Sequence, residues 1–306
     1  MSKQHTVSIP ATVANVGPGF DVLGLCVTGL ADTMTGELQD GPSVVTEVTG
    51  VDADSIPKEP TKNCAVIAAE AYLRANSCSQ NLSFAIARQI PLSGGLGSSA
   101  AASVGGALLA ATCLGKEHAV ADIMQAALVG EAAVAGRHLD NIAACALGGF
   151  VAVRDTESVD VVGLGAPAEL FVAVVTPAQK LDTKASRAAL PTTLPTKTWT
   201  QQMANCTALA AAIWLKDWNL LRRSLHDHFA EPGRGPLIPD FSAVKDAALG
   251  SGALGCSISG GGPSIFAITT SRSQAEACAE AMAAALTQPP RLSHVGAINP
   301  QGAHAL

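Results

Sequence analysis

The stretch PLSGGLGSSAA at positions 91–101 decides the fold, because it joins a strand pattern to a helix pattern through a glycine loop. The segment before it, 82–89, alternates apolar and polar residues as a strand does. The segment after it is rich in alanine as far as residue 114, and a serine pair stands where a helix would begin. Glycines let backbone N–H groups approach an anion, and a helix start adds N–H donors without partners inside the helix. The stretch is therefore a candidate phosphate cradle, although a plain glycine turn before a helix would have the same composition.

Two common nucleotide motifs do not describe this loop. It is not a GxGxxG sequence, and the one Gly-Lys pair in the chain, at 115–116, lacks the upstream glycine and the Ser or Thr of a Walker A motif. A phosphate site here would therefore be of another kind.

Outward from the loop, strand and helix patterns are mixed rather than strictly alternating, which favours an α+β fold over a doubly wound sheet. We expect strands near 6–10, 22–30, 43–51, 82–89, 148–153 and 170–176, and two more around the glycine turn of 256–269. We expect helices near 63–75, 98–114, 118–135, 240–251 and 274–286, one or two helices over 199–229, and loops at 154–166, 191–198 and 232–239. The composition change near 154–166 suggests a domain boundary, so we predict one domain over 1–155 and a second over 156–306.

Composition excludes several classes of function. The 306 residues are 48% hydrophobic and 14% charged with a formal net charge of −6, so a disordered chain is excluded and a nucleic-acid surface is not expected. The first residues lack the pattern of a signal peptide, and the longest small apolar stretch, 100–114, is shorter than a membrane span. Eight cysteines without a CxxC spacing indicate free thiols in a reducing compartment. We expect a cytoplasmic protein without a membrane or nucleic-acid partner.

Glu131 is a single carboxylate among small apolar residues of a predicted helix. It either faces water or is buried, and a buried carboxylate needs a partner because an unpaired buried charge is costly. A Mg²⁺ ion could be that partner, together with a loop hydroxyl and nucleotide phosphates.

Polar residues GRHLDN at 136–141 follow that helix directly. They could line a cleft between the helix and the next strand, or they could simply form a hydrogen-bonded helix exit.

The sequence SGGGP at 259–263 stands between two apolar strand patterns. Three consecutive glycines indicate a close approach of the backbone to another group, although a tight hairpin would also use them.

Three motifs together carry a family resemblance. PATVANVGPGFD at 10–21, PLSGGLGSSAAA at 91–102 and GALGCSISGGGP at 252–263 resemble, in order and spacing, the three motifs of the GHMP kinases. Within that superfamily the first motif resembles the PATSANLGPGFD sequence of homoserine kinases. HLDNIAACALGGF at 138–150 and the arginine segments at 187–191 and 234–239 resemble further segments of that family.

The resemblance implies a two-domain GHMP kinase fold, with a ribosomal-protein-S5-like N-terminal domain and a ferredoxin-like C-terminal domain. It implies ATP as phosphoryl donor, Mg²⁺ held by Ser99 (or Ser98) and Glu131, L-homoserine as acceptor in threonine biosynthesis, and a possible homodimer. The implied nucleotide-binding residues are Pro91, Leu92, Ser93, Gly94, Gly95, Leu96, Gly97, Ser98, Ser99, Ala100, Ala101, Asn63, Gly260 and Gly261.

Homoserine is a zwitterion that carries a hydroxyl group, so its site needs an acid for the ammonium and a base for the carboxylate. On the implied positions, Asp21 with Asn15 would bind the ammonium, and Arg187 and Arg234 would bind the carboxylate, because guanidinium matches carboxylate geometry. Thr183 would help to place the substrate.

Near the transferred phosphoryl, the resemblance implies Asn141 as an orienting group, with His138 and Asp140 as candidates for positioning or proton handling. An amide cannot take a proton, and we expect no strong base, the hydroxyl proton leaving on a phosphate oxygen. Two alternatives remain open: a kinase for another small alcohol of the mevalonate or shikimate type, and a catalytically silent ligand-binding protein of the same fold.

Overall fold

The computed structural model describes residues 4–115 and 117–306, without the side chains of residues 183 and 184. Over these residues the larger sheet has seven strands. Five of them follow the order β11-β1-β2-β4-β3, and β5 pairs with β2 on one side and with β6 on the other. All of these pairs are antiparallel except β3 with β4. The strands are β1 (His5–Ala14), β2 (Leu23–Gln39), β3 (Val44–Gly50), β4 (Asn81–Arg88), β5 (Phe150–Asp155), β6 (Asp160–Gly165) and β11 (His304–Ala305).

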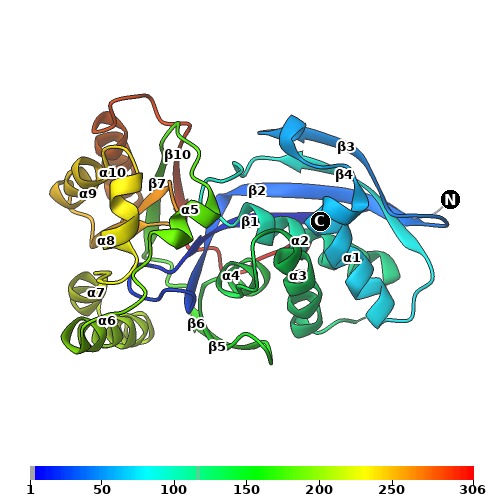
Figure 1. Ribbon diagram of the computed structural model, residues 1–306, viewed down its shortest axis with the longest axis horizontal. Helices are drawn as coiled ribbons and strands as arrows, with labels where there is room; N and C mark the ends of the chain where they lie inside the picture. Colours follow the sequence, from blue (N-terminus) through cyan, green and yellow to red (C-terminus); the bar gives the residue numbers. More distant parts are fainter. Residues whose placement is uncertain (1–3, 116) are drawn as a thin grey trace.

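Four helices gather on one face of this sheet (Figure 1). They are α1 (Cys64–Ala75), α2 (Ser98–Leu114), α3 (Val120–Val134) and α4 (Asp140–Leu147). The central helix, α2, is buried along most of its length because its small residues let neighbours approach closely. A Cβ at Gly106 would lie 2.0 Å from the Ala65 carbonyl oxygen of α1, so only glycine fits there. The alanine-rich sequence thus brings the start of α2 into a fixed position under the glycine loop.

The smaller sheet has four antiparallel strands in the order β10-β7-β9-β8, covered by two helices. They are β7 (Phe171–Thr176), β8 (Gly255–Ile258), β9 (Ile265–Thr269), β10 (Leu292–Ala297), α9 (Phe241–Gly250) and α10 (Arg272–Ala284). Successive residues of β7 enter different cores, since side chains alternate across a strand. Val172 and Val174 pack in the larger core, and Ala173 and Val175 pack under α9 and α10. The smaller sheet is therefore buried on both faces.

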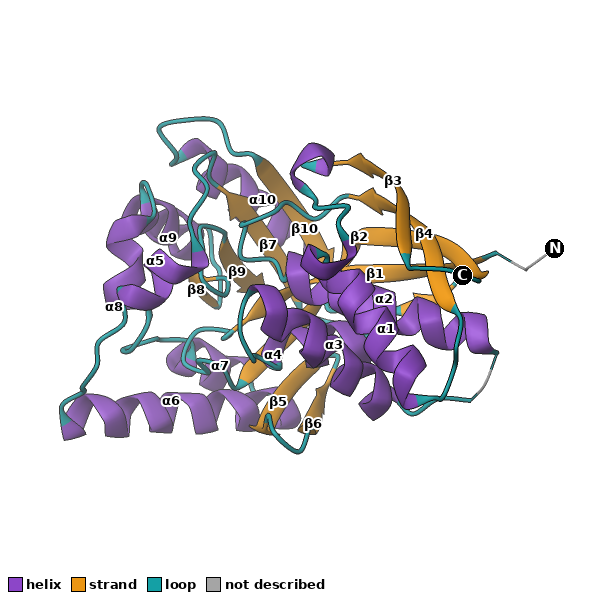
Figure 2. Ribbon diagram, turned by 45° about the vertical axis from the view of Figure 1, so that its right-hand side comes forward, coloured by secondary structure: helices purple, strands orange, loops and turns teal. Residues whose placement is uncertain are grey.

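Four more helices follow one another between β7 and α9: α5 (Thr183–Ala188), α6 (Thr196–Leu215), α7 (Trp218–Ser224) and α8 (Glu231–Arg234). The remaining helical elements are short 3₁₀ turns, at Ala53–Ser55, Pro60–Lys62 and Gly235–Leu237. With 20 residues, α6 is about 30 Å long and runs along the outside of the molecule (Figure 2). Leu209 and Ile213 on its inner face pack into the larger core.

The predicted α+β arrangement of mixed strands and helices is the one observed, but several local predictions were wrong or missing. The expected loop 154–166 contains the end of β5, a short turn and β6, which pairs with β5 across that turn. The segment 232–239 forms α8 and a 3₁₀ turn, and α6 begins inside the expected loop 191–198. We did not anticipate α4, α5, β10 or β11.

The pairing of strands also runs past the predicted domain boundary. Both β6 and β11 belong to the larger sheet, although both lie beyond residue 155. The division into 1–155 and 156–306 remains a prediction.

All eight cysteines are free thiols in the structure. Among the described residues, no helix combines the length and the hydropathy that crossing a membrane requires.

Candidate active site

The glycine loop at 94–97 is held in place by the two other motifs. The Ser259 hydroxyl donates to the Gly95 carbonyl oxygen (2.7 Å), and the Gly260 N–H donates to the Ala14 carbonyl oxygen (3.1 Å). Gly95 has a φ of 80°, and an added Cβ would lie 2.3 Å from the Ser259 carbonyl oxygen. The three motifs, far apart in the sequence, thus meet around one loop.

Gly97 precedes α2 and has a left-handed φ of 68°. A Cβ there would lie 2.0 Å from Thr12 Oγ1 and 2.8 Å from Asn141 Oδ1. The buried Thr12 hydroxyl donates to Asn141 Oδ1 at 2.7 Å. This bond holds the oxygen of the amide and leaves its NH₂ group available to the cleft that Asn141 lines.

A cleft of about 250 Å³ lies over the loop and the start of α2. Most residues that the sequence singled out line it together: Asn15, Asp21, Leu92, Ser93, Gly94, Gly95, Gly97, Ser98, Ser99, Glu131, His138, Asp140, Asn141, Arg187, Arg234, Gly260 and Gly261. Ala14, Val134 and Ala135 complete the lining.

Glu131 is buried on α3 and faces the serine pair at the start of α2. The Ser99 hydroxyl donates to Glu131 Oε1 (2.8 Å), while Oε2 is buried without a hydrogen-bond partner. Burial raises the pKa of Glu131 to about 7. An oxygen buried in this way fits a cation ligand, because a bound cation would supply the missing partner.

Ser98 is engaged differently from its neighbour. Its hydroxyl accepts a hydrogen bond from the Arg88 guanidinium (2.7 Å) and points to the core below the loop. Of the two serines, only Ser99 contacts the Glu131 carboxylate.

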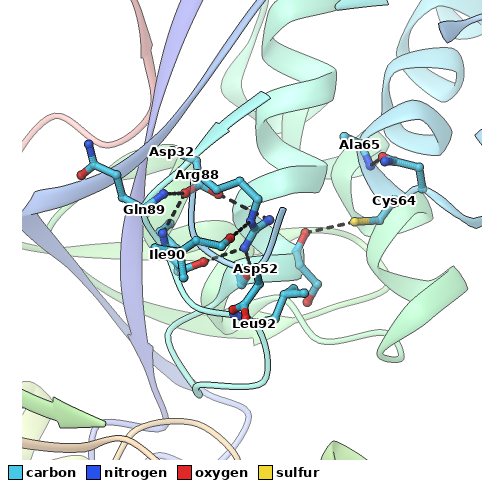
Figure 3. A network of polar contacts seen from close by, with 12 residues as sticks. Asp32, Asp52, Cys64, Ala65, Arg88, Gln89, Ile90 and Leu92 are labelled. Atoms are coloured by element: carbon cyan, nitrogen blue, oxygen red, sulfur yellow. Dashed lines mark hydrogen bonds and ion pairs between the residues drawn. The ribbon is translucent and has the colours of Figure 1, made fainter. Parts of the chain in front are cut away.

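A buried polar network supports the loop from below (Figure 3). Arg88 also donates to the Ile90 carbonyl oxygen (2.6 Å) and lies 3.7 Å from Asp32, whose Oδ1 accepts the N–H groups of Gln89 and Ile90. Every one of these contacts lies on β2, β4 or the segment leading to the loop. The network therefore fixes where the loop begins.

Asp52 holds the next residue, Leu92, by accepting its N–H (2.9 Å). The same carboxylate pairs with Arg291 just before β10, and Lys180 lies 3.5 Å away. Arg291 in turn donates to the Leu92 carbonyl oxygen (3.0 Å). The start of the loop is thus tied to the smaller sheet as well.

Asp21 and Arg187 form an ion pair at the other end of the cleft. Arg187 Nη2 donates to both carboxylate oxygens (3.0 and 3.1 Å), and each side chain is about one-third exposed. Arg234 is buried, donates to the Gly260 carbonyl oxygen (2.9 Å) and lies over the Phe20 ring. Burial and the Arg187 charge lower the pKa of Arg234. This end therefore carries two cations and one carboxylate.

His138 and Asp140 lie between the two ends. His138 Nδ1 is 3.1 Å from Arg187 Nη2 and 3.7 Å from Asp21. Burial lowers the pKa of His138, and the nearby arginines act in the same direction. Asp140 is buried at the start of α4, where burial and the Asp21 charge raise its pKa to about 7.

Asn15 lines the cleft but uses its amide inside the protein. Its Nδ2 donates to the Gly260 carbonyl oxygen (3.0 Å), and its Oδ1 accepts the Asp21 N–H (3.1 Å). The side chain therefore holds the left-handed backbone of Asp21 in place.

Several residues implied by the resemblance do not line the cleft. Asn63 caps α1 by accepting the N–H groups of Ala65 and Val66, and donates to the Pro57 carbonyl oxygen. Pro91, Leu96, Ala100 and Ala101 are buried beside or below the loop. The side chain of Thr183, at the start of α5, lies outside the described part of the structure.

Sequence reasoning missed Thr12, Phe20 and Arg88. Thr12 and Phe20 lie inside the first motif, but their contacts with Asn141 and with Arg187 and Arg234 span more than 100 residues. Arg88 is the last residue of β4, and nothing in the sequence around it shows that its guanidinium is buried against Ser98 and Asp32.

Comparisons with protein families and with known proteins agree with this arrangement of the three motifs. The GHMP kinase N-terminal domain family matches residues 63–149, and the GHMP kinase C-terminal family matches residues 207–288. Homoserine kinase of Chlorobaculum tepidum is 38% identical over 287 residues, which cover 90% of this chain and 88% of that protein. Homoserine kinase of Arabidopsis thaliana is 39% identical and covers 94% of this chain and 80% of its own length.

Comparisons with solved structures lead to the same family. The crystal structure of homoserine kinase from Cytophaga hutchinsonii has a TM-score of 0.95 and 38% identity, and covers 100% of this chain and 98% of that one. The mevalonate kinase of L. major, at 14% identity and a TM-score of 0.74, shares the fold. The three converging motifs and these similarities lead to one conclusion: the chain belongs to the homoserine kinase family of the GHMP kinases.

Proposed function

We propose that this protein transfers the γ-phosphoryl group of ATP to the hydroxyl of L-homoserine and forms O-phospho-L-homoserine. The observation that carries the proposal is the placement of two unlike subsites in one cleft. One end has the glycine loop with Ser99 and Glu131, and the other has Asp21, Arg187 and Arg234. This pair of subsites suits a phosphate-rich donor and a zwitterionic acceptor.

At the donor end, N–H groups of the loop and of the first turn of α2 would bind the nucleotide phosphates. Ser99 and Glu131 would hold Mg²⁺, since Glu131 Oε2 is buried and unpartnered. A bound Mg²⁺ would neutralise phosphate charge during transfer.

At the acceptor end, Asp21 and Arg187 carry charges opposite to those of the substrate's ammonium and carboxylate groups. The homoserine ammonium would pair with Asp21 and its carboxylate with Arg187, so that both side chains exchange one charged partner for another. Arg234, which has no carboxylate partner among the described contacts, would add a second cation. Mevalonate and shikimate have no ammonium, which disfavours them here.

Between the ends, the Asn141 NH₂ group, oriented by Thr12, would contact the attacking hydroxyl or the γ-phosphate. Positioning and charge stabilisation supply most of the catalysis in phosphoryl transfer. We propose that the hydroxyl proton leaves on a phosphate oxygen. If Asp140→Asn lowered turnover more than about 10³-fold, Asp140 would instead be the base.

The test is ADP release from MgATP with L-homoserine, beside L-serine, mevalonate and shikimate. The proposal expects turnover with homoserine alone, and loss of that turnover in Arg187→Met. Turnover only with another alcohol would keep the kinase and discard the zwitterion subsite. Tight ATP binding without turnover on any of the four would indicate a silent binding protein.

A further inference from the structure

The acceptor end of the cleft includes two segments that are distant in the sequence. The turn of residues 15–21 carries Phe20 and Asp21, and the segment 226–234 carries Arg234 on α8. Neither segment has a long helix or a strand to fix it, because α8 has only four residues and the turn begins where β1 ends. The position of Arg234 relative to Asp21 therefore depends on side-chain contacts outside the cleft.

The turn 15–21 needs such contacts because its backbone is strained. Asn15, Val16 and Asp21 have left-handed φ values of 68°, 44° and 56°. A β-branched residue such as Val16 rarely adopts this conformation, which persists only where the surrounding structure holds it. Asn15 holds one side of the turn by accepting the Asp21 N–H. A side chain of α6 holds the other side, at the Pro18 carbonyl oxygen.

That side chain is Gln202, which is buried on the inner face of α6. Its Nε2 donates to the Pro18 carbonyl oxygen and to Asp227 Oδ1, both at 2.9 Å. Its Oε1 accepts the His228 N–H at 2.7 Å. One amide thus uses both its donors and its acceptor, and it joins the turn of Pro18 to the segment that leads to α8.

Asp227 extends this connection to α8. Its two carboxylate oxygens accept the N–H groups of Phe229, Ala230 and Glu231, at distances between 2.8 and 3.2 Å. A carboxylate that accepts the first N–H groups of a helix fixes where the helix begins. Arg234 lies three residues after Glu231 on the same short helix, so its position follows from this cap.

The rings of Phe20 and Phe229 form a second connection between the two segments. Their centroids are 4.9 Å apart and their planes meet at 78°, which is an edge-to-face contact. The guanidinium groups of Arg187 and Arg234 lie over the Phe20 ring, 5.4 and 5.2 Å from its centroid. Both cations proposed for the substrate carboxylate thus rest on a ring that the segment 226–234 supports.

We infer that Gln202 is a positioning residue of the acceptor subsite, which sets the spacing between Asp21 and Arg234 without lining the cleft itself. The inference rests on the proposed function for the identity of the substrate. The ammonium and carboxylate groups of homoserine are attached to one carbon atom. Asp21 and Arg234 can therefore pair with both groups at once only when they are correctly spaced. Gln202 thus contributes to the affinity for homoserine and not to the affinity for ATP.

Loss of the Gln202 hydrogen bonds would separate the two segments without releasing α8. The Glu231 carboxylate accepts the Ser257 hydroxyl of β8 (2.8 Å) and pairs with Lys245 of α9. These contacts hold α8 on the smaller sheet independently of α6. The consequence is a misplaced turn 15–21 and a poorly formed subsite, rather than an unfolded domain.

Initial rates with MgATP and L-homoserine test the inference on the full chain. The variant is Gln202→Met, because methionine keeps the length of the side chain and removes its hydrogen bonds. The matched control is Gln274→Met: Gln274 on α10 donates to the Gly252 carbonyl oxygen (2.8 Å), away from the cleft. In Gln202→Met the KM for L-homoserine should rise at least about fivefold, while kcat and the KM for ATP stay within about twofold. Gln274→Met should change none of the three.

A second variant, Phe229→Leu, tests the other connection. Phe229 is only half-buried, so the variant should fold, and thermal unfolding by circular dichroism checks this for every variant. Loss of the edge-to-face contact should raise the KM for L-homoserine about two- to tenfold and leave the KM for ATP unchanged.

Hydrogen–deuterium exchange, followed by mass spectrometry, measures the connection without turnover. In Gln202→Met, peptides that cover residues 18–23 and 226–231 should both exchange faster than in the wild type, and peptides of α10 should not change. Three results would overturn the inference: an unchanged KM for L-homoserine, an equal rise of that KM in Gln274→Met, or faster exchange in only one of the two segments. A wild type without turnover on L-homoserine would contradict the proposed function instead, and the exchange rates would still decide whether Gln202 joins the segments.

Discussion

Thr12→Val removes the hydroxyl that orients Asn141 and changes little else in shape. The Thr12 side chain is fully buried, and its hydroxyl donates to Asn141 Oδ1 at 2.7 Å. Without the donor, the amide oxygen loses its partner and the side chain can turn its NH₂ group away from the cleft. Removing one partner of a buried hydrogen bond costs about 1–3 kcal/mol.

If the whole cost falls on the transition state, kcat decreases roughly 5- to 150-fold. The KM for ATP should change little, because the backbone of the glycine loop is untouched. Initial rates of ADP release at saturating and limiting ATP separate the two parameters. Thr12→Ser keeps the hydroxyl and should stay within a few fold of the wild type.

Thr6→Val is the matched control. Thr6 lies on the same strand, and its hydroxyl pairs with the Thr35 hydroxyl at 2.9 Å, far along β1 from the cleft. It should cost stability without changing kcat. The reasoning would be refuted if Thr12→Val kept wild-type kcat while losing as much stability as Thr6→Val.

Three further changes test other contacts. Between about pH 4.5 and 7 the Glu131 carboxyl is ionised in the unfolded chain but keeps its proton in the folded protein. The free energy of unfolding of the metal-free protein should therefore decrease by roughly 3 kcal/mol as the pH rises through this range. Calorimetry should show a weaker pH dependence in Glu131→Gln, in which Asp140, whose pKa is also raised, still contributes. Asp21→Asn should raise the KM for L-homoserine about 10- to 150-fold and leave that for ATP unchanged, since it weakens a charge-assisted bond; the exposed Arg137→Gln should change neither in initial-rate assays. Gly97→Ala should lower kcat and the melting temperature far more than Gly115→Ala, because both glycines are left-handed but only Gly97 has neighbours that a Cβ would strike.

Most strands and helices with a clear period were predictable. The alternation of 82–89 and the alanine-rich run after Gly97 correspond to β4 and α2 within a residue or two. β6 was not predictable, because acidic and glycine residues disguise it and its pairing with β5 decides its structure. Likewise we did not anticipate the eight-residue helix α4, which begins at the last two residues of the polar cluster 136–141 and continues to Leu147.

The membership of the cleft was largely predictable, but the partners of its residues were not. Motifs bring Asp21, Arg187 and Glu131 to one cleft, yet nothing in their sequence neighbourhood shows that Asp21 pairs with Arg187. The resemblance implies Asn63 as a nucleotide-binding residue, and the sequence gives no sign that its amide caps α1. Hydrogen bonds between distant segments depend on the packing of the whole fold, which a local pattern does not encode.

The short strand β11 has a consequence for how the protein is made. His304 and Ala305 pair with Ser8 and Val7, and the Leu306 N–H donates to the Thr6 carbonyl oxygen. During synthesis, β1 emerges first, but this edge of it stays open until the ribosome has added nearly 300 more residues. An open edge invites pairing with other chains. Nascent chains and chains shortened by a few C-terminal residues would therefore expose the same edge of β1. Chaperones that bind open strand edges would recognise both in the same way.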